Sequence, residues 1–378
     1  MELYLDNAAT TQIDKDVLEQ YIQLISSQFA STGSLHSLGE NSLNLENLSR
    51  IKIANLLKVR PNEILFNSGA TEGNNFAIKG VALKYKNRGK TLITTKVEHP
   101  SVAQCFKQLE QDFGFKCIYL DVDSNGVVDI NQLEKSMSDD VILVSIMYVN
   151  HEVGSIMPIT KIGQILKKYP KAIFHTDITQ ALGKINIDLT NVDIATMSAH
   201  KIHGIKGSGF IYKKEKIEFY PLISGHPAAN ALRAGTSNWP SNVVLSLALE
   251  KTLKNLKASF NEIRRSQEKL INELASIDNV VLNTSIDKCI PNIINFSIIG
   301  YNSEVVIRAL SLKNIFVSSR SVCSTSKDEQ ISVTLSAMNK PDEVSISSIR
   351  ISFDKPLDDD QIKYFIDSLK EVIKVLRK

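Results

Sequence analysis

The stretch "EILFNSGATEGNNFAIKGVALKY", residues 63–85, predicts a β-strand, a glycine turn and an α-helix in direct succession. The same alternation of short apolar β-rich runs with helical patterns continues along the next hundred residues. Further strands are expected at 91–96, 115–122, 141–149, 172–178 and 192–199, and further helices at 100–113 and 159–169. Apolar strands separated by helices of this length predict an α/β fold with a parallel sheet that is covered on both faces.

The C-terminal third of the chain has a different pattern. A long helical stretch at 241–277, with one possible break, is expected to connect two domains. Strands are expected at 292–299, 315–319 and 347–353, and helices at 303–314 and 358–376. These elements are enough for a smaller α+β domain. A length of 378 residues also fits two domains better than one.

Composition narrows the function classes. The formal net charge of +3 and the dispersed lysines argue against direct nucleic-acid binding. The N-terminus lacks the features of a secretion signal, and no apolar run reaches the length of a membrane span. Cys105, Cys117, Cys289 and Cys323 form no CxxC pair, so we expect neither disulfides nor a metal site, and a cytoplasmic location.

Residues that could take part in catalysis or ligand binding lie at the ends of the predicted strands. Lys201 lies between a strand and a glycine-rich turn in "TMSAHKIHGIKGSGF", residues 196–210. Asp177 follows another strand, with Gln180 one turn later. In parallel sheets, ligands bind at the carboxyl ends of the strands. These residues are therefore expected to share one site.

A phosphate site is expected at the start of the helix in residues 63–85. Thr71 and Glu72 lie in its first turn, where free backbone N–H groups and the helix dipole favour an anion. A lysine, a strand-end aspartate and a phosphate cradle on one sheet are the parts that a pyridoxal phosphate enzyme needs. His99 in "TKVEHPSV" adds an imidazole that could lie over the cofactor ring.

The sequence resembles the cysteine desulfurases, the class V aminotransferase-like enzymes that include bacterial NifS and IscS. The resemblance covers nearly the whole chain, through "YLDNAATT", "ILFNSGATEGNNFAIKG", "TKVEHPSV", "ILVSIMYVNHEVG", "HTDITQALGK", "SAHKIHGIKGSG", "LRAGT", "VSSRSVCSTS" and "SSIRISF". It implies the pyridoxal phosphate transferase fold type I, with a mainly parallel seven-stranded sheet. The large domain would span 13–250, and the small domain 1–12 with 251–378.

The resemblance also implies roles for single residues. Lys201 would hold pyridoxal 5'-phosphate and move the Cα proton, with His99 assisting and Cys323 accepting the sulfur as a persulfide. Asp177 would pair with the ring nitrogen of the cofactor and Gln180 with its phenolic oxygen, and Arg350 would grip the substrate carboxylate. The residues expected to bind the cofactor are Ala70, Thr71, His99, His151, Asp177, Gln180, Ser198, His200, Lys201 and, from the partner subunit of a homodimer, Thr236.

Several positions depart from the family pattern. His151 replaces an asparagine that contacts the phenolic oxygen of the cofactor, and imidazole can still donate a hydrogen bond there. "SGHPAANALRAGT", residues 224–236, has lost glycines and has Asn230 in place of an arginine. "ASTGSLH", residues 30–36, is altered near the substrate. Arg320 stands three residues before Cys323, where it could lower the pKa of the thiol or alter the path of the loop.

The expected activity is conversion of L-cysteine to L-alanine with transfer of sulfur to an iron–sulfur scaffold protein or a transfer-RNA thiolation enzyme. The altered substrate loops leave a related pyridoxal phosphate lyase, such as a selenocysteine lyase, or a transaminase as alternatives. A non-catalytic paralogue is a third alternative, although such a protein would not need Lys201 and Cys323.

Overall fold

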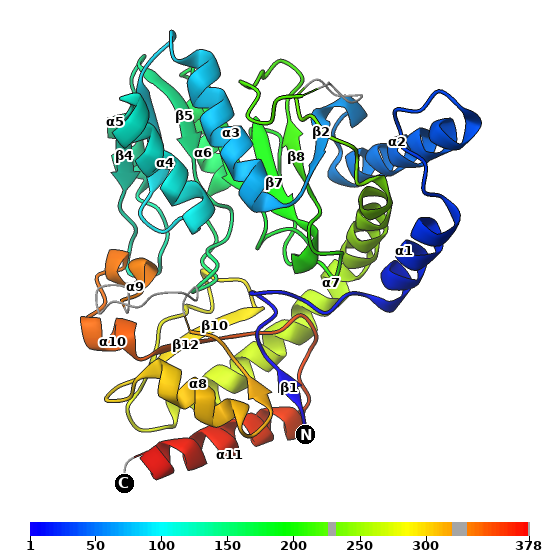
Figure 1. Cartoon of the computed structure of the whole chain (residues 1–378). Helices are drawn as coiled ribbons and strands as arrows, with labels where there is room; N and C mark the ends of the chain where they lie inside the picture. The colour runs from blue at the N-terminus through cyan, green and yellow to red at the C-terminus, as the bar shows by residue number, and fades with distance from the viewer. Residues whose placement is uncertain (226–231, 320–330, 377–378) are drawn as a thin grey trace.

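The structure is a computed structural model that describes residues 1–225, 232–319 and 331–376. A seven-stranded sheet with helices on both faces forms the larger part of the molecule (Figure 1). Its strand order is β2-β8-β7-β6-β5-β3-β4. The strands are β2 (Ile64–Asn67), β3 (Thr91–Thr95), β4 (Lys116–Leu120), β5 (Val141–Ser145), β6 (Ile173–Asp177), β7 (Ile194–Ser198) and β8 (Gly209–Lys213).

Two apolar layers cover the sheet because its strands are hydrophobic on both faces. Neighbouring residues of one strand, such as Leu92 and Ile93, point to opposite faces and enter different cores. Helices α3 (Ala70–Tyr85) and α4 (Pro100–Phe113) cover one face. The other face packs against α2 (Ser37–Leu57), α5 (Ile130–Ser136), α6 (Ile159–Leu166) and the first part of α7 (Trp239–Ala275). The predicted α/β fold is confirmed.

Strand β8 is the exception to the parallel arrangement, and the sequence analysis did not predict it. It runs antiparallel to both of its neighbours, β2 and β7. Strands β2 and β7 therefore point in the same direction, although they do not touch. The mainly parallel character of the seven-stranded sheet is confirmed, with this one reversed strand.

A smaller group of elements packs beneath the sheet around a second apolar core (Figure 1). It contains the antiparallel sheet β12-β10-β9 and the parallel pair β1-β11, covered by the C-terminal half of α7 and by two further helices. The elements are β1 (Leu3–Tyr4), β9 (Val280–Leu282), β10 (Ile293–Ile298), α8 (Ser303–Ser311), β11 (Ile315–Phe316), α10 (Asp342–Ile346), β12 (Ser348–Ser352) and α11 (Asp359–Leu376). Helix α9 (Val333–Ala337) lies between β11 and α10 in sequence, but its Leu335 packs in the core of the large sheet.

Helix α7 contributes side chains to the cores of both parts. Leu245 and Leu249 pack against the large sheet, and Leu270 and Leu274 lie in the second core. The helix is continuous, so the possible break in 241–277 is not observed. Leu3 and Leu5 also lie in the second core, since β1 pairs with β11. The domain limits at residues 12 and 250 stay a prediction.

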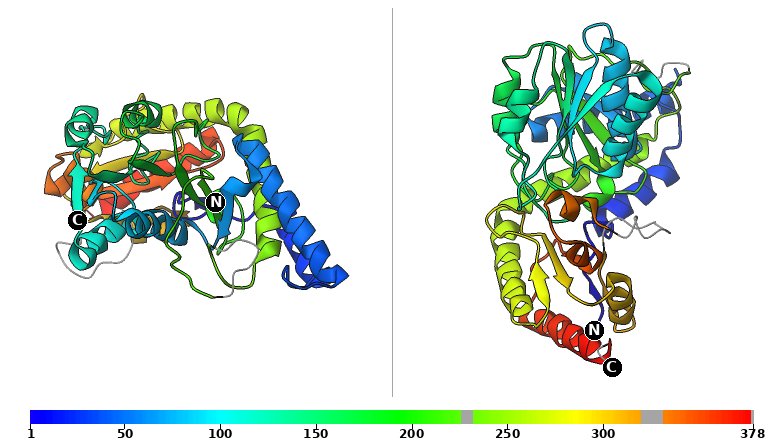
Figure 2. Two further views of the ribbon diagram at one scale, coloured as in Figure 1. Left: turned by 90° about the horizontal axis from the view of Figure 1, so that it is seen from above. Right: turned by 90° about the vertical axis from the view of Figure 1, so that its left-hand side faces the viewer.

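Two N-terminal helices, which were not anticipated, pack along the first half of α7. They are α1 (Lys15–Ser27) and α2, which extend away from the large sheet (Figure 2), except that Ile53 and Ala54 near the end of α2 pack into its core. Within the described residues, no helix combines the length and the apolar character that crossing a bilayer requires.

Candidate active site

The reversed strand β8 brings two loops of the site together. Its first residue, Gly209, pairs with Asn67 at the end of β2 on one side and with Ser198 at the end of β7 on the other. A Cβ atom on Gly209 would lie 2.7 Å from the Cα of Gly69, so only glycine allows this approach. The start of α3 is thereby placed beside the end of β7.

A cavity at the N-terminus of α3 lies where these two loops meet. The Ser198 hydroxyl accepts a hydrogen bond of 2.7 Å from the backbone N–H of Ala70, at the N-terminus of α3. The cavity, of about 430 Å³, lies over this point. It is lined by Ala9, Thr10, Ser68, Gly69, Ala70, Thr71, Glu72, Ser198, His200, Lys206 and Gly207. Four residues expected to bind phosphate, namely Ala70, Thr71, Ser198 and His200, therefore line one cavity.

Lys201 ends a short 3-10 helix, Ala199–Lys201, that directly follows β7. Its amine donates hydrogen bonds of 2.5 Å to the carbonyl oxygens of Ala8 and Ala9. Burial, together with the positive charges of Lys184 and Arg350, lowers the pKa of this amine to about 7, against the opposing effect of Asp6 and Asp177. A large fraction of Lys201 is therefore a neutral nucleophile near pH 7.

Asp177 is the last residue of β6 and is buried. Its carboxylate accepts hydrogen bonds from the side chain of Asn74, at 2.8 Å, and from the backbone N–H of Thr179, at 2.9 Å. Asn74 also donates to Ser101 Oγ at 2.8 Å, and this hydroxyl lies 2.8 Å from His99 Nδ1. One network thus links Asp177 to His99, and the sequence analysis had not identified Asn74 or Ser101.

His99 forms the N-terminal cap of α4 and packs against His151 in the loop that follows β5. The two rings meet edge to face, with centroids 5.3 Å apart and an interplanar angle of 72°. Burial lowers the pKa of His99 and lowers that of His151 well below the usual value. Both imidazoles are therefore neutral near pH 7, and each has one N–H and one acceptor nitrogen.

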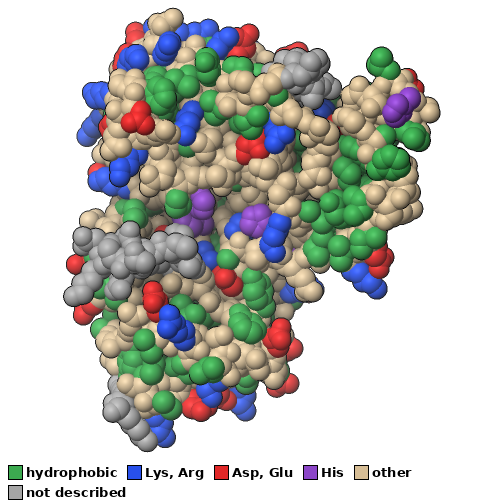
Figure 3. Space-filling model, viewed as in Figure 1, with side chains coloured by type: hydrophobic (Ala, Val, Ile, Leu, Met, Phe, Trp, Pro, Cys, Tyr) green, Lys and Arg blue, Asp and Glu red, His purple; other side chains and the backbone are tan. Residues whose placement is uncertain are grey.

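Arg350 lies on β12 and is buried at the contact between the two parts of the molecule. Its guanidinium donates to the carbonyl oxygen of His151 at 2.8 Å and to Asp6 Oδ1 at 2.9 Å. Its Nε atom is buried and has no hydrogen-bond partner among the described residues. Arg350 is thus adjacent to the His99–His151 pair, and its Nε–H group is available to donate a hydrogen bond. On the face seen in Figure 3, histidine side chains lie where the large and small parts meet.

Gln180, one turn after β6, also joins this group. Its amide nitrogen donates at 2.9 Å to the carbonyl oxygen of Ala8, the same atom that accepts from Lys201. The N-terminal segment 6–11 therefore forms part of the site. The sequence analysis had quoted this segment but had assigned no function to its residues.

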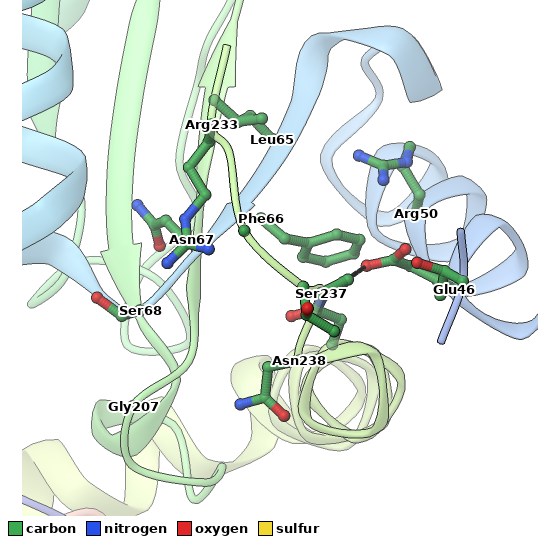
Figure 4. Close-up of a pocket in the computed structure, with 14 residues that line it drawn as sticks. Glu46, Arg50, Leu65, Phe66, Asn67, Ser68, Gly207, Arg233, Ser237 and Asn238 are labelled. Carbon is green, nitrogen blue, oxygen red and sulfur yellow. Dashed lines mark hydrogen bonds between the residues drawn. The ribbon is translucent and has the colours of Figure 1, made fainter. Parts of the chain in front are cut away.

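Thr236 is not part of the cavity that holds Ala70 and Ser198. It is exposed and lines a neighbouring cavity of about 290 Å³, which shares Ser68 and Gly207 with the first (Figure 4). Glu46 is buried at the far side of this second cavity and accepts hydrogen bonds from Ser237 and Asn242. Within one chain, Thr236 is thus separated from the other predicted phosphate ligands.

Some predictions lie outside the described residues. They concern Cys323 and Arg320, in 320–330, and the altered segment at 226–231, which includes Asn230.

The polar atoms around Lys201 fit pyridoxal phosphate. Both ring nitrogens of His151 are buried without a hydrogen-bond partner among the described residues, as is Nε of Arg350. Buried polar atoms of this kind are costly unless a ligand satisfies them. The cavity at the start of α3 suits a phosphate, and the Asp177 carboxylate suits a protonated ring nitrogen. The hydrogen-bonding groups around Lys201 therefore match those that pyridoxal phosphate requires. The fold and the site together define a lysine-dependent α/β enzyme of the pyridoxal phosphate class.

The comparisons with known proteins agree with this class. The sequence model of the aminotransferase class-V family matches residues 3–365. A cysteine desulfurase IscS of Dictyoglomus turgidum is 37% identical and covers 100% of this chain and 95% of its own. The putative cysteine desulfurase IscS 1 of Bacillus subtilis is 36% identical, with 99% of each chain covered.

Solved structures extend the similarity to three dimensions. A NifS-like protein superposes with a TM-score of 0.93 at 34% identity, covering 99% of this chain and 100% of its own. The complex of SspA with cysteine gives a TM-score of 0.82 at 32% identity, over 95% of this chain and 100% of that one. The chain belongs to the aminotransferase class-V family, within its group of IscS- and NifS-like cysteine desulfurases.

Proposed function

We propose that this protein is a pyridoxal 5'-phosphate-dependent cysteine desulfurase. In the overall reaction the Cβ–S bond of L-cysteine breaks, L-alanine is released, and the sulfur joins the thiol of Cys323 as a persulfide. The observation that carries this proposal is the buried Lys201 amine with a pKa of about 7, set beside a cavity that unites Ala70, Thr71, Ser198 and His200. The full-length similarity to cysteine desulfurases supports it.

The residues around Lys201 support separate roles. When bound, pyridoxal phosphate supplies an electron sink for the Cα of an amino acid. Lys201 would hold the cofactor and move the Cα proton, since its amine is partly neutral near pH 7. Asp177, held by Asn74 and Thr179, would fix the proton on the ring nitrogen.

His99 and His151 would contact the cofactor as neutral imidazoles. A cation at either position is disfavoured because both rings are buried and Lys201 is close. Arg350 would bind the carboxylate of the substrate, for which its Nε is available. Bidentate binding would use Nε together with a second N–H of the guanidinium.

The active form is proposed to be a homodimer in which Thr236 reaches the phosphate of the partner subunit. Its exposed position, away from the cavity of its own chain, supports this arrangement. A face of α1 and the loop after it exposes Leu18, Ile22, Ile25 and Phe29, at helical spacing.

We also propose a sulfur-acceptor protein as partner and a reducing, cytoplasmic setting. Cys105, Cys117 and Cys289, the cysteines among the described residues, are free thiols.

The test is turnover of L-cysteine by protein loaded with pyridoxal phosphate. Alanine and sulfide are measured with a reductant present, and the persulfide is trapped and located by mass spectrometry. We expect modified Cys323 in the wild type and loss of sulfide release in Cys323→Ala. Faster turnover of selenocysteine with negligible activity on cysteine would instead favour a lyase of the alternative class, and unchanged sulfide release in Cys323→Ala would contradict the loop-thiol mechanism.

A further inference from the structure

Lys184 is a buried cation that the proposed mechanism leaves without a role. Its side chain is 5% exposed and lies seven residues after the end of β6. Burial lowers the pKa of this amine, Asp354 raises it, and Arg350 lowers it. A buried lysine is costly for stability, because its charge loses hydration. Its position near the site therefore calls for an explanation beyond packing.

The hydrogen bonds of Lys184 lead to Gln180. Its amine donates to Gln180 Oε1 at 3.3 Å, and Gln180 Nε2 donates to the carbonyl oxygen of Ala8 at 2.9 Å. That carbonyl oxygen also accepts from Lys201 Nζ at 2.5 Å. A continuous chain of polar contacts thus joins the buried cation to the lysine of the site.

The chemistry of the lysine sets the orientation of the amide. The carbonyl oxygen of Ala8 can only accept, and the Lys184 amine donates, so the amide oxygen of Gln180 faces Lys184. The NH₂ group of Gln180 then faces the opposite direction, toward Ala8 and Lys201. With the amide turned over, two donors would meet at Lys184 and two acceptors at Ala8.

The backbone also favours this contact. Gly183 has a φ of +80°, which side-chain-bearing residues rarely adopt, and its Cβ position would be 2.3 Å from Thr252 Cγ2. Gly183 lies in the turn between Gln180 and Lys184. This turn allows the buried side chain of Lys184 to reach the side chain of Gln180 in the interior of the molecule.

We infer that Lys184 is a positioning residue that holds the amide of Gln180 with its NH₂ group directed at the site around Lys201. The inference rests on the proposed function, because the group that the NH₂ would meet there is the phenolic oxygen of pyridoxal phosphate. Gln180 then acts as a donor to that oxygen and stabilises its anionic form. The charged and titratable groups that face Lys201 are Asp6, His99, His151, Asp177, Lys184, His200 and Arg350.

The test uses the absorbance of the lysine-bound cofactor, titrated with pH in the absence of cysteine. In Lys184→Met the amide loses its partner at Oε1 and keeps only the contact with the carbonyl oxygen of Ala8, so the donor to the phenolic oxygen is less firmly held. The pKa of the chromophore should rise by about one unit, a tenfold change in its proton affinity. Met retains the length and apolar stem of lysine, so the melting temperature of the apo-protein should be kept. Lys171→Met, at an exposed lysine, is the matched control and should leave the pKa unchanged.

A second background separates positioning from simple charge. In Gln180→Ala protein, the further change Lys184→Met should shift the chromophore pKa by less than about a third as much, because the amide that Lys184 holds is gone. An equal shift in both backgrounds would mean that Lys184 acts by its charge alone, which overturns the inference. An unchanged pKa in Lys184→Met also overturns it.

A further variant covers the case in which Lys184→Met does not fold. Gln180→Glu replaces the NH₂ group by a carboxylate oxygen, which cannot donate when ionised, and keeps a partner for Lys184. The chromophore pKa should rise at least as far as expected for Lys184→Met, and an unchanged value contradicts the inference. If the wild type itself acquires no visible absorbance, the cofactor proposal fails and this inference fails with it.

Discussion

Arg350 and Asp6 form an ion pair, with Nη2 and Oδ1 2.9 Å apart, in which a half-buried aspartate two residues after β1 meets a buried arginine in the middle of β12. Burial raises the pKa of Asp6, while Arg350 lowers it. The pair holds the N-terminal segment against the site, where the carbonyl oxygens of Ala8 and Ala9 accept from Lys201. A substrate carboxylate that binds Arg350 would share its guanidinium with Asp6 and with the carbonyl oxygen of His151.

Arg350→Lys should weaken binding of L-cysteine more than it slows turnover. Lysine keeps the positive charge and loses the planar pair of donors, each worth about 1.5–3 kcal/mol to a charged partner. We expect KM for cysteine to rise about 10- to 100-fold, with a smaller change in kcat. Steady-state alanine release measures both constants. Arg308→Lys, at an exposed position on α8, is the control, and an unaltered KM in Arg350→Lys would argue against carboxylate binding.

The rate of cofactor loading should follow the titration of Lys201. Only the neutral amine attacks the cofactor aldehyde, and burial lowers the pKa of this amine to about 7. The loading rate should therefore rise about tenfold per pH unit below pH 7 and level off above it. Stopped-flow absorbance of apo-protein mixed with pyridoxal phosphate gives the profile. A rate that still climbs steeply from pH 8 to 9 would indicate a lysine with an ordinary pKa, and Lys201→Ala should show no visible chromophore.

Asp177→Asn should lower kcat/KM by about 10²-fold while leaving the chromophore in place. The variant keeps the shape of the side chain but loses the charge that would hold the ring nitrogen protonated. It also turns an acceptor into a donor beside Asn74 or Thr179. Alanine release and the visible spectrum are the measurements. Asp278→Asn, at an exposed position, provides the comparison, and full activity in Asp177→Asn would remove this carboxylate from the mechanism.

Glu98→Gln should stabilise the protein at alkaline pH. Burial, with a smaller effect of the nearby Asp177, raises the pKa of Glu98 to about 8, against hydrogen bonds from Met147 and Thr95. Between pH 4.5 and 8 the folded state keeps a proton that the unfolded state releases, so the stability of the wild type falls as pH rises through this range. Glutamine does not titrate and therefore avoids this loss.

The melting temperature of the two proteins should diverge with pH. At pH 5 we expect similar values, and at pH 8 a value about 2–4 °C higher for Glu98→Gln. Calorimetry at both pH values on apo-protein is the measurement. A difference that is the same at pH 5 and pH 8 would contradict the raised pKa of Glu98.

Ile22→Glu should shift the protein from dimer to monomer. Ile22 is 51% exposed in the centre of the apolar face of α1, and a charge there opposes burial against a second copy. Size-exclusion chromatography with light scattering should give a mass near 42.0 kDa for the variant and twice that for the wild type. Val375→Glu, which places the same charge on exposed α11, should remain dimeric. Activity should fall with the dimer if Thr236 completes the partner's site.

Much of this architecture could be predicted from sequence because apolar strands and amphipathic helices carry local signals. Helix α4 was predicted at its observed limits, and the predicted strands of the large sheet lie within one to four residues of the observed ones. Strand β8 was not predicted because "GFIYK" is short and directly follows a glycine-rich turn, and this turn was the only feature assigned to that region. Helices α1 and α2 were missed because they lie outside the repeated strand–helix pattern.

The sequence alone determined which chemical groups are available, since a lysine, an aspartate and a glycine turn at strand ends are recognisable without coordinates. Tertiary structure decided which of them meet. Only the reversed β8 places Ala70 beside Ser198, and only the contact between the two parts brings Arg350 to His151 and Asp6. The polar chain from Lys184 to Lys201 likewise depends on the carbonyl of Ala8, which is distant in sequence. Such contacts arise from long-range packing, which local sequence patterns do not encode.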